Sequence, residues 1–152
     1  MKLLKNYIQE KLIIKKNKVA GYKYFPKTKE ELKDIITKRI KAEGKEVDLN
    51  DIDTSKITDM SELFLHLDFN GDISNWDVSN VTDMSGMFFM CSKFDQDISS
   101  WDVSNVTNMY SMFHGCESFN QDISSWDVSN VTNVESIFKR CQIEEKYNPK
   151  FK

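Results

Sequence analysis

The sequence predicts an α/β repeat solenoid, a stack of rungs that each contain a strand, a turn and a short helix. The segment WDVSNVT occurs three times at a spacing of 25 residues, beginning at Trp76, Trp101 and Trp126. Phenylalanine and cysteine recur in the same register, at Phe88, Phe113, Phe138, Cys91, Cys116 and Cys141. Because one such unit cannot bury its apolar residues alone, successive units are expected to stack.

The strand is predicted from the apolar residues around each tryptophan. Ile98, Trp101 and Val103 fit the L-x-x-L-x-L pattern of a leucine-rich repeat, with other apolar residues substituted. The same frame recurs at Leu49, Ile52, Thr54; Ile73, Trp76, Val78; and Ile123, Trp126, Val128. Since side chains alternate along a strand, Trp101 and Val103 are expected to point into the core, and Ser, Asp and Asn to form the exposed face.

The helix is predicted from the residues that follow. Thr107 lies where a helix N-cap is expected, and the same place is occupied by Thr58, Thr82 and Thr132. Behind it, Met109, Met112, Phe113 and Cys116 fall at i, i+3, i+4 and i+7, the spacing of one helical face. Each rung is therefore expected to end in about two turns of helix.

The chain is expected to form one structural domain with a cap at each end. Residues 1–46 are interpreted as an N-terminal cap, with a hairpin or a helix first and then an amphipathic helix over 29–43 that opens at the capping box Thr28–Glu31. Residues 47–141 hold four repeats, of which the first is degenerate, and residues 142–152 form a C-terminal capping tail.

Charge and hydropathy exclude several classes of function. Residues 1–46 carry a net charge of +8 and residues 47–152 of −11, and an acidic array is a poor surface for nucleic acid. No apolar stretch is long enough to span a membrane. The N-terminus has charges where a signal peptide needs an unbroken apolar region, which indicates a cytoplasmic protein.

The segment WDVSNVTDMSGMF, followed by FDQDISSWDVSNVT, resembles a bacterial surface protein and lipoprotein repeat family of about 25 residues. This family is a domain of unknown function, known from mycoplasma lipoproteins and akin to the BspA-like leucine-rich repeats. The resemblance implies a right-handed leucine-rich-repeat-like solenoid with a role in surface display or protein interaction. It also implies a surface or secreted location, in contrast to the N-terminus, and it brings no enzymatic activity.

A column of aspartates is the strongest candidate site. Asp53, Asp77, Asp102 and Asp127 recur at one position of the predicted exposed face. Three interpretations remain open: the carboxylates satisfy turns and backbone amides, they bind a basic partner, or the repeats bind calcium, whose oxygen-rich coordination would suit the second column Asp72, Asp97 and Asp122. The predicted partner-binding residues are Asp53, Asp77, Ser79, Ser100, Asp102, Ser104, Ser125, Asp127 and Ser129.

Catalytic and metal chemistry find little support in the sequence. The three cysteines fall on the core face, where free buried thiols are expected, and their spacing matches no zinc pattern even with His114 as a fourth ligand. His66 and His114 are the only histidines, and neither lies in a catalytic motif. We therefore expect no catalytic residue, no metal site and no cofactor.

The function predicted is a non-enzymatic protein-interaction or surface-display module that uses its acidic, Ser/Asn-rich face. The alternative is a calcium-binding structural or adhesin-like repeat. The partner is expected to be a protein of unknown identity, and the chain a monomer or a weak dimer through an end rung.

Overall fold

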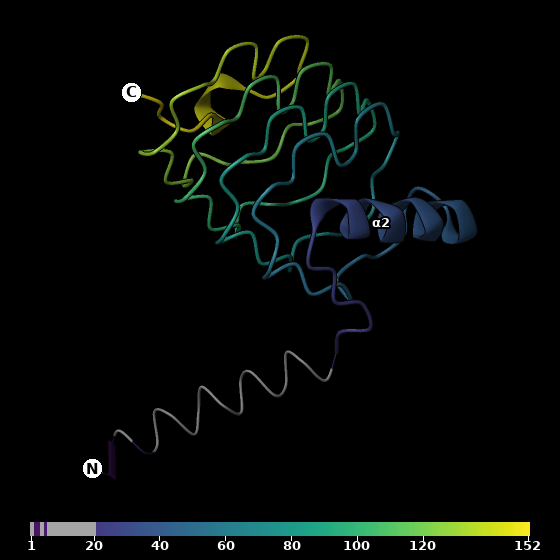
Figure 1. The fold of residues 1–152 in the computed structure, drawn as a ribbon. Helices are drawn as coiled ribbons and strands as arrows, with labels where there is room; N and C mark the ends of the chain where they lie inside the picture. Colours follow the sequence, from purple (N-terminus) through teal and green to yellow (C-terminus); the bar gives the residue numbers. More distant parts are fainter. Residues whose placement is uncertain (1, 4, 6–20) are drawn as a thin grey trace.

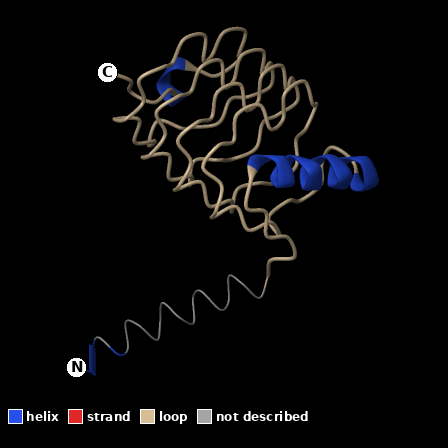
Figure 2. Cartoon of the chain, viewed as in Figure 1, coloured by secondary structure: helices blue, strands red, loops and turns tan. Residues whose placement is uncertain are grey.

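The computed structural model describes residues 2, 3, 5 and 21–152. In this part, the helices that follow residue 20 are α2 (Lys29–Glu43) and the 3-10 helix η1 (Glu145–Tyr147), and the remaining chain forms turns and loops (Figure 2). The predicted hairpin or helix ahead of α2 depends on residues 6–20, which lie outside the described residues. The repeats form successive loops that lie beside one another from α2 to the C-terminus (Figure 1).

The predicted α/β repeat solenoid with strand rungs is wrong. The described residues contain no sheet, only isolated parallel bridges: Tyr24 with Ile52, Asp59 with Asp83, Asp83 with Asn108, and Asn108 with Asn133. At the predicted strand, Trp101 N–H donates to the Ile98 carbonyl at 3.1 Å. Val106 N–H likewise donates to the Val103 carbonyl at 2.9 Å. These bonds close tight turns, so the leucine-rich-repeat interpretation is wrong as well.

The predicted short helix is also replaced by turns. Met112 N–H donates to the Met109 carbonyl at 3.2 Å, and Cys116 N–H to the Phe113 carbonyl at 3.0 Å. Ser111 and Gly115, the third residues of these two turns, have φ of 51° and 75°. A left-handed residue in each turn cannot continue a right-handed helix, and it fits the third position of a type II turn.

Hydrogen bonds between repeats replace the missing sheet. Met109 and Ser111 N–H donate to the carbonyls of Asn133 and Glu135 in the next repeat, both at 2.9 Å. Side chains add further links, because the Trp126 indole N–H donates to the Ile98 carbonyl at 3.2 Å and the Asn130 amide to the Ser104 carbonyl at 2.7 Å. Each repeat therefore uses its neighbour to satisfy its backbone.

The core is a column of aromatic rings that runs through the repeats. Phe88 stacks on Phe64 and on Phe113 with ring centroids 5.4 and 5.5 Å apart, and Phe113 stacks on Phe138 at 5.8 Å. Trp101 stacks on Trp126 at 6.5 Å. Most apolar residues that the repeat frame placed inside are buried, although the backbone that carries them is not a strand. In the last repeat, Val134, Phe138 and Cys141 are only half-buried.

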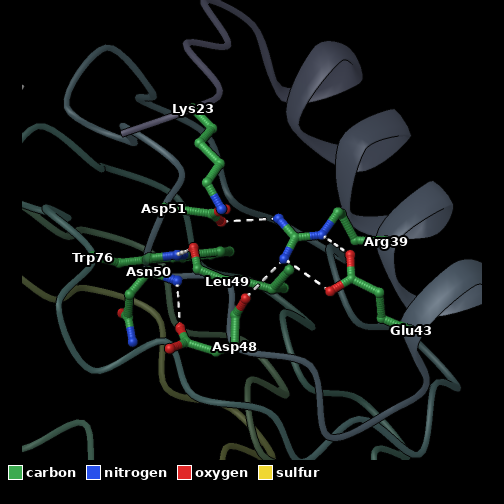
Figure 3. A network of polar contacts seen from close by, with 8 residues as sticks. All are labelled: Lys23, Arg39, Glu43, Asp48, Leu49, Asn50, Asp51 and Trp76. Carbon is green, nitrogen blue, oxygen red and sulfur yellow. Dashed lines mark hydrogen bonds and ion pairs between the residues drawn. The ribbon is translucent and has the colours of Figure 1, made fainter. Parts of the chain in front are cut away.

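Helix α2 covers the first repeat, and its range is the one predicted. Its N-cap is Thr28, whose hydroxyl oxygen accepts from Glu31 N–H at 3.2 Å, and it buries Leu32 and Ile36. Figure 3 shows how Arg39 fastens the helix: its guanidinium donates to Asp51 Oδ1 at 2.8 Å and to the Asp48 carbonyl at 3.1 Å. Only 13 % of the Arg39 side chain is exposed, so this ion pair is largely shielded from solvent.

Candidate functional site

The predicted aspartate column forms a series of Asx turns. Asp77 Oδ1 accepts from the backbone N–H of Ser79 at 3.0 Å and from its hydroxyl at 2.6 Å. Asp102 makes the same two bonds with Ser104, at 3.1 and 2.6 Å. Asp53 accepts from Ser55 N–H at 3.0 Å, and Asp127 from Ser129 N–H at 3.1 Å. One oxygen of each carboxylate is therefore committed to its own turn.

The carboxylates of the column take part in no ion pair among the described residues. No lysine or arginine among the described residues forms an ion pair with Asp53, Asp77, Asp102 or Asp127. By contrast, Asp51, which lies beside the column, pairs with Lys23 and Arg39. The second oxygen of each column carboxylate thus remains available to a ligand.

A groove lies along part of this column. It has a volume of about 490 Å³ and its lining includes Asp77, Ser100 and Asp102, with Tyr22 contributed by the segment before α2. The other lining residues are Gly21, Asn50, Ser74, Asn75, Trp76 and Val78. The groove therefore combines two incompletely neutralised carboxylates with an aromatic ring.

The pKa values within this column reflect both the turns and the mutual repulsion. The Ser104 hydroxyl lowers the pKa of Asp102, and the nearby charge of Asp127 opposes this effect. Burial raises the pKa of Tyr22, and the charges of Asp53 and Asp77 raise it further. The lowered pKa of Asp102 keeps this carboxylate ionised at neutral pH, and the charge of Asp127 is close enough to act on it, which favours a cationic ligand.

The remaining predicted residues lie along the column but outside the groove. Ser79 and Ser104 use their hydroxyls in the Asx turns, so these hydroxyls are already engaged as donors. Ser100, which lines the groove, donates to the Ser74 carbonyl at 3.2 Å. Ser125 and Ser129 are exposed in the last repeat. The structure therefore brings together Asp77, Ser100 and Asp102, and leaves the other six spread along the column.

Sequence reasoning missed Tyr22 as a wall of the groove. No repeat contains this residue, and its contact with the column depends on the segment before α2, which pairs with the first repeat. Lys23 N–H donates to the Asp51 carbonyl at 2.8 Å, and Asp53 N–H donates to the Tyr24 carbonyl at 2.9 Å. No local sequence pattern around Tyr22 predicts this long-range pairing.

The second aspartate column is also built from Asx turns. Asp72, Asp97 and Asp122 accept from the backbone N–H of Ser74, Ser99 and Ser124 at 2.9, 2.9 and 3.0 Å. No group of three or more His, Cys, Asp or Glu in the described part of the chain is arranged to hold a metal ion.

The cysteines are free thiols that pack in the core. Cys91 and Cys116 are buried and Cys141 is half-buried. Burial raises the pKa of Cys91 to about 12 and raises that of Cys116 as well. Thiols with a raised pKa are poor nucleophiles, because the thiolate is the reactive form.

The rings of the two histidines, His66 and His114, both lie near the ring of Phe89. The ring centroids of His66 and His114 are 5.6 and 4.8 Å from that of Phe89.

Among residues 2, 3, 5 and 21–152, no helix is long and apolar enough to cross a membrane.

The chain was also compared with known proteins. Residues 31–150 match the family described as "Mycoplasma protein of unknown function, DUF285". This match supports the predicted bacterial domain of unknown function, but not its assignment to the BspA-like leucine-rich-repeat type. No curated protein and no solved structure matches the chain. Since the matched region covers most of the sequence, the chain belongs to the DUF285 family of mycoplasma proteins of unknown function.

Proposed function

We propose that this protein is a non-catalytic binding module whose aspartate groove binds a basic segment of a partner protein. The observation that carries this proposal is the pair of carboxylates, Asp77 and Asp102, that line one groove without an ion-pair partner among the described residues. Each keeps one oxygen in an Asx turn, so its side chain is already oriented before a ligand arrives. Orientation in advance reduces the entropic cost of binding.

The lining of the groove fits a lysine or arginine side chain. The free carboxylate oxygens can accept from an ammonium or guanidinium group, and Tyr22 offers an aromatic surface to the aliphatic stem or the cation. Neighbouring aspartates repel each other, because the charge of Asp127 acts against the lowering of the Asp102 pKa by Ser104. Binding of a cation would offset this repulsion. A protein segment with several basic residues could contact more than one member of the column.

The test is fluorescence anisotropy with a short capped peptide in which lysine alternates with serine. Asp77→Asn combined with Asp102→Asn removes both charges and keeps an oxygen that can accept the Asx-turn bond. We expect this double variant to bind the peptide about tenfold more weakly, since two charge-assisted contacts of about 0.7 kcal/mol each are lost.

The matched control is the double variant Asp97→Asn and Asp122→Asn. It removes the same charge from the second column, where the aspartates form the same kind of turn. Unchanged affinity in the control together with weaker binding in the groove variant would support the proposal. Equal losses in both variants would show that only net charge matters, and no binding by the unmodified protein would refute the proposal.

A further inference from the structure

The peptide groups of the stacked repeats are aligned in four columns. In the first column, N–H groups donate to carbonyls of the next repeat at 2.9 Å each: Met60 to Asp83, Met84 to Asn108 and Met109 to Asn133. The other three columns have distances of 2.7 to 3.0 Å. The second column joins Glu62 to Ser85, Gly86 to Tyr110 and Ser111 to Glu135, and the third joins Phe64 to Met87, Phe88 to Met112 and Phe113 to Ile137. The fourth column joins His66 to Phe89, Met90 to His114 and Gly115 to Lys139. These bonds all point toward the last repeat. A fifth column points the opposite way, because the N–H groups of Thr82, Thr107 and Thr132 donate to the carbonyls of Thr58, Thr82 and Thr107 at 2.9, 2.9 and 2.8 Å.

Such an arrangement is electrostatically similar to an α-helix, in which aligned peptide dipoles leave partial charges at the two ends. In the four columns, the free N–H groups fall in the last repeat and the free carbonyls in the first. A helix end with about four unpaired groups carries roughly half an elementary charge. Because four columns point one way and the threonine column points the other way, an end of this stack is expected to carry a smaller charge of the same sign as the four columns. The last repeat is the positive end.

The free donors are four N–H groups of the last repeat. Val134, Ser136, Phe138 and Arg140 occupy the positions that donate in the three preceding repeats, but their N–H groups have no acceptor among the described residues. The backbone keeps the same turns, because Ile137 N–H donates to the Val134 carbonyl at 3.1 Å and Cys141 N–H to the Phe138 carbonyl at 3.1 Å. We call residues 134–140 the terminal ledge.

The φ angles support the same orientation of these donors. Ser136 and Arg140 have φ of 58° and 57°, and the equivalent Ser111 and Gly115 have 51° and 75°. The N–H groups of the terminal ledge therefore point out of the end of the stack, where a further repeat would supply carbonyls.

Side-chain burial shows that the terminal ledge is open. Ser111 and Phe113 are 3 % and 0 % exposed, whereas Ser136 and Phe138 at the equivalent positions are only half-buried. The C-terminal tail covers a different part of the last repeat, where Ile123 N–H donates to the Tyr147 carbonyl at 3.1 Å. Figure 1 shows this repeat, in green to yellow, at the end of the stack opposite α2.

The charged side chains of the ledge add to the positive end. Lys139 and Arg140 are exposed and form no ion pair with any described carboxylate, and Glu135 is the one acid within the ledge. Burial is the main cause that lowers the pKa of His114, and the charges of Lys139 and Arg140 lower it further.

The first repeat shows the complementary arrangement at the negative end. Lys29 Nζ donates to Asp59 Oδ2 at 3.0 Å and to Ser61 Oγ at 2.7 Å, beside the residues whose carbonyls begin the columns. A cation is thus held at the end where the aligned dipoles favour positive charge.

We propose that the terminal ledge binds an extended acidic segment of a partner protein. An extended peptide supplies a row of carbonyls for the four donors, and its carboxylates can pair with Lys139 and Arg140. Val134 and Phe138, both half-buried, offer apolar contacts between these polar groups. This surface is separate from the aspartate groove and has the opposite charge preference.

The layout of the donors favours a peptide over a small anion or a second copy of the chain. The four N–H groups are distributed over seven residues, so a single phosphate could reach only part of them. A second copy would have to present the carbonyls of its first repeat, next to which Lys29 of α2 is bound.

The first test is amide hydrogen exchange of the full chain, read residue by residue by NMR. In the free protein, the amides of Val134, Ser136, Phe138 and Arg140 should exchange much faster than those of Met109, Ser111, Phe113 and Gly115. A capped peptide in which glutamate alternates with threonine should slow the exchange of the first set selectively. Fast exchange that the peptide leaves unchanged would overturn the proposal.

The second test is fluorescence anisotropy with the same peptide. Lys139→Gln combined with Arg140→Gln should weaken binding about fivefold, and high salt should weaken it as well. Lys56→Gln combined with Lys93→Gln is the control, because both lysines are exposed and distant in sequence from the ledge. Equal weakening in the two double variants would refute the proposal. The proposal would also be refuted if the ledge amides exchanged slowly without peptide and slowed further as the protein concentration rose. Analytical ultracentrifugation would then have to show dimerisation over the same range of concentration.

Discussion

Replacement of Phe113 by alanine is expected to destabilise the protein more than the same replacement one repeat later, at Phe138. The two residues occupy the same position of the repeat frame. Phe113 is 0 % exposed and its ring lies between Phe88 at 5.5 Å and Phe138 at 5.8 Å, with Phe119 at 4.4 Å. Phe138 is half-buried, and among the described residues its ring stacks only on Phe113.

The magnitudes follow from these environments. A fully buried phenylalanine replaced by alanine costs about 3–5 kcal/mol, because burial is lost and a cavity is left behind. Stacking on both sides places Phe113→Ala near the middle of that range, at about 4 kcal/mol. Phe138→Ala loses roughly half the burial and one stacking partner, so about 2 kcal/mol is expected.

Urea unfolding monitored by tryptophan fluorescence measures this difference, since Trp101 and Trp126 lie within the core of the repeats. The midpoint should fall further for Phe113→Ala, with a slope close to that of the unmodified protein. Equal destabilisation by the two variants would refute the reasoning, because it would mean that the last repeat is packed as tightly as the inner ones. An altered slope would indicate separate unfolding of the last repeat, and kinetic unfolding would then resolve the two steps.

Three further predictions concern thiols, pH and a tight backbone contact. A thiol reagent should modify half-buried Cys141 first in the native protein and leave Cys116 unreactive until unfolding, as mass spectrometry of modified peptides can show. Serine hydroxyls lower the pKa of Asp102 and other aspartates in the folded state. The stability of the protein should therefore be full above about pH 5 and should fall below about pH 4. A urea midpoint that rises on acidification would contradict this expectation. Gly71→Ala should lower the urea midpoint by the equivalent of about 2 kcal/mol, since its Cβ would overlap the Val47 carbonyl, whereas Gly44→Ala meets no atom and should cost only about 1 kcal/mol of backbone strain.

Helix α2 could be predicted from the sequence because its signals are local. Thr28 and Glu31 form the cap at the N-terminus, and Gly44 at the C-terminus has a φ of 96°. The apolar residues between them, such as Leu32 and Ile36, fall on one face and are buried. These features depend only on residues a few positions apart, so the sequence pattern is sufficient.

The repeats could not be predicted in the same way, because two backbones place the same residues inside. Burial of Ile98, Trp101 and Val103 fits a strand, but it fits tight turns equally well. The choice is made by bonds to residues 25 positions away, which apolar spacing does not report. One local signal did favour turns over the predicted helix: Gly86 and Gly115, both with positive φ, interrupt the helical stripe in two repeats.

The candidate site could be predicted in part, because its Asx turns, like helix α2, have a local signal in the sequence. The spacing Asp-x-Ser is a local signal for an Asx turn, and the observed bonds agree with the interpretation that the column satisfies turns and backbone amides. The position of Tyr22 and the free donors of the last repeat depend on how distant segments pack. No window of sequence contains both partners of these contacts.

Recurrence at 25-residue intervals is by itself no sign of a binding role in this protein. The Asn105 amide donates to the Ser79 carbonyl at 2.7 Å, and the Thr107 hydroxyl donates to the Thr82 carbonyl at 3.2 Å, so both recurring side chains serve the scaffold. A ligand can use only the groups that the scaffold leaves unpaired. These are the second oxygens of aspartates such as Asp102 and the N–H groups of the terminal ledge. The number of free aspartate oxygens grows with each added repeat, whereas the free N–H groups of the terminal ledge occur once in any array. The length of an array would therefore change its affinity for basic partners and leave its affinity for acidic partners the same.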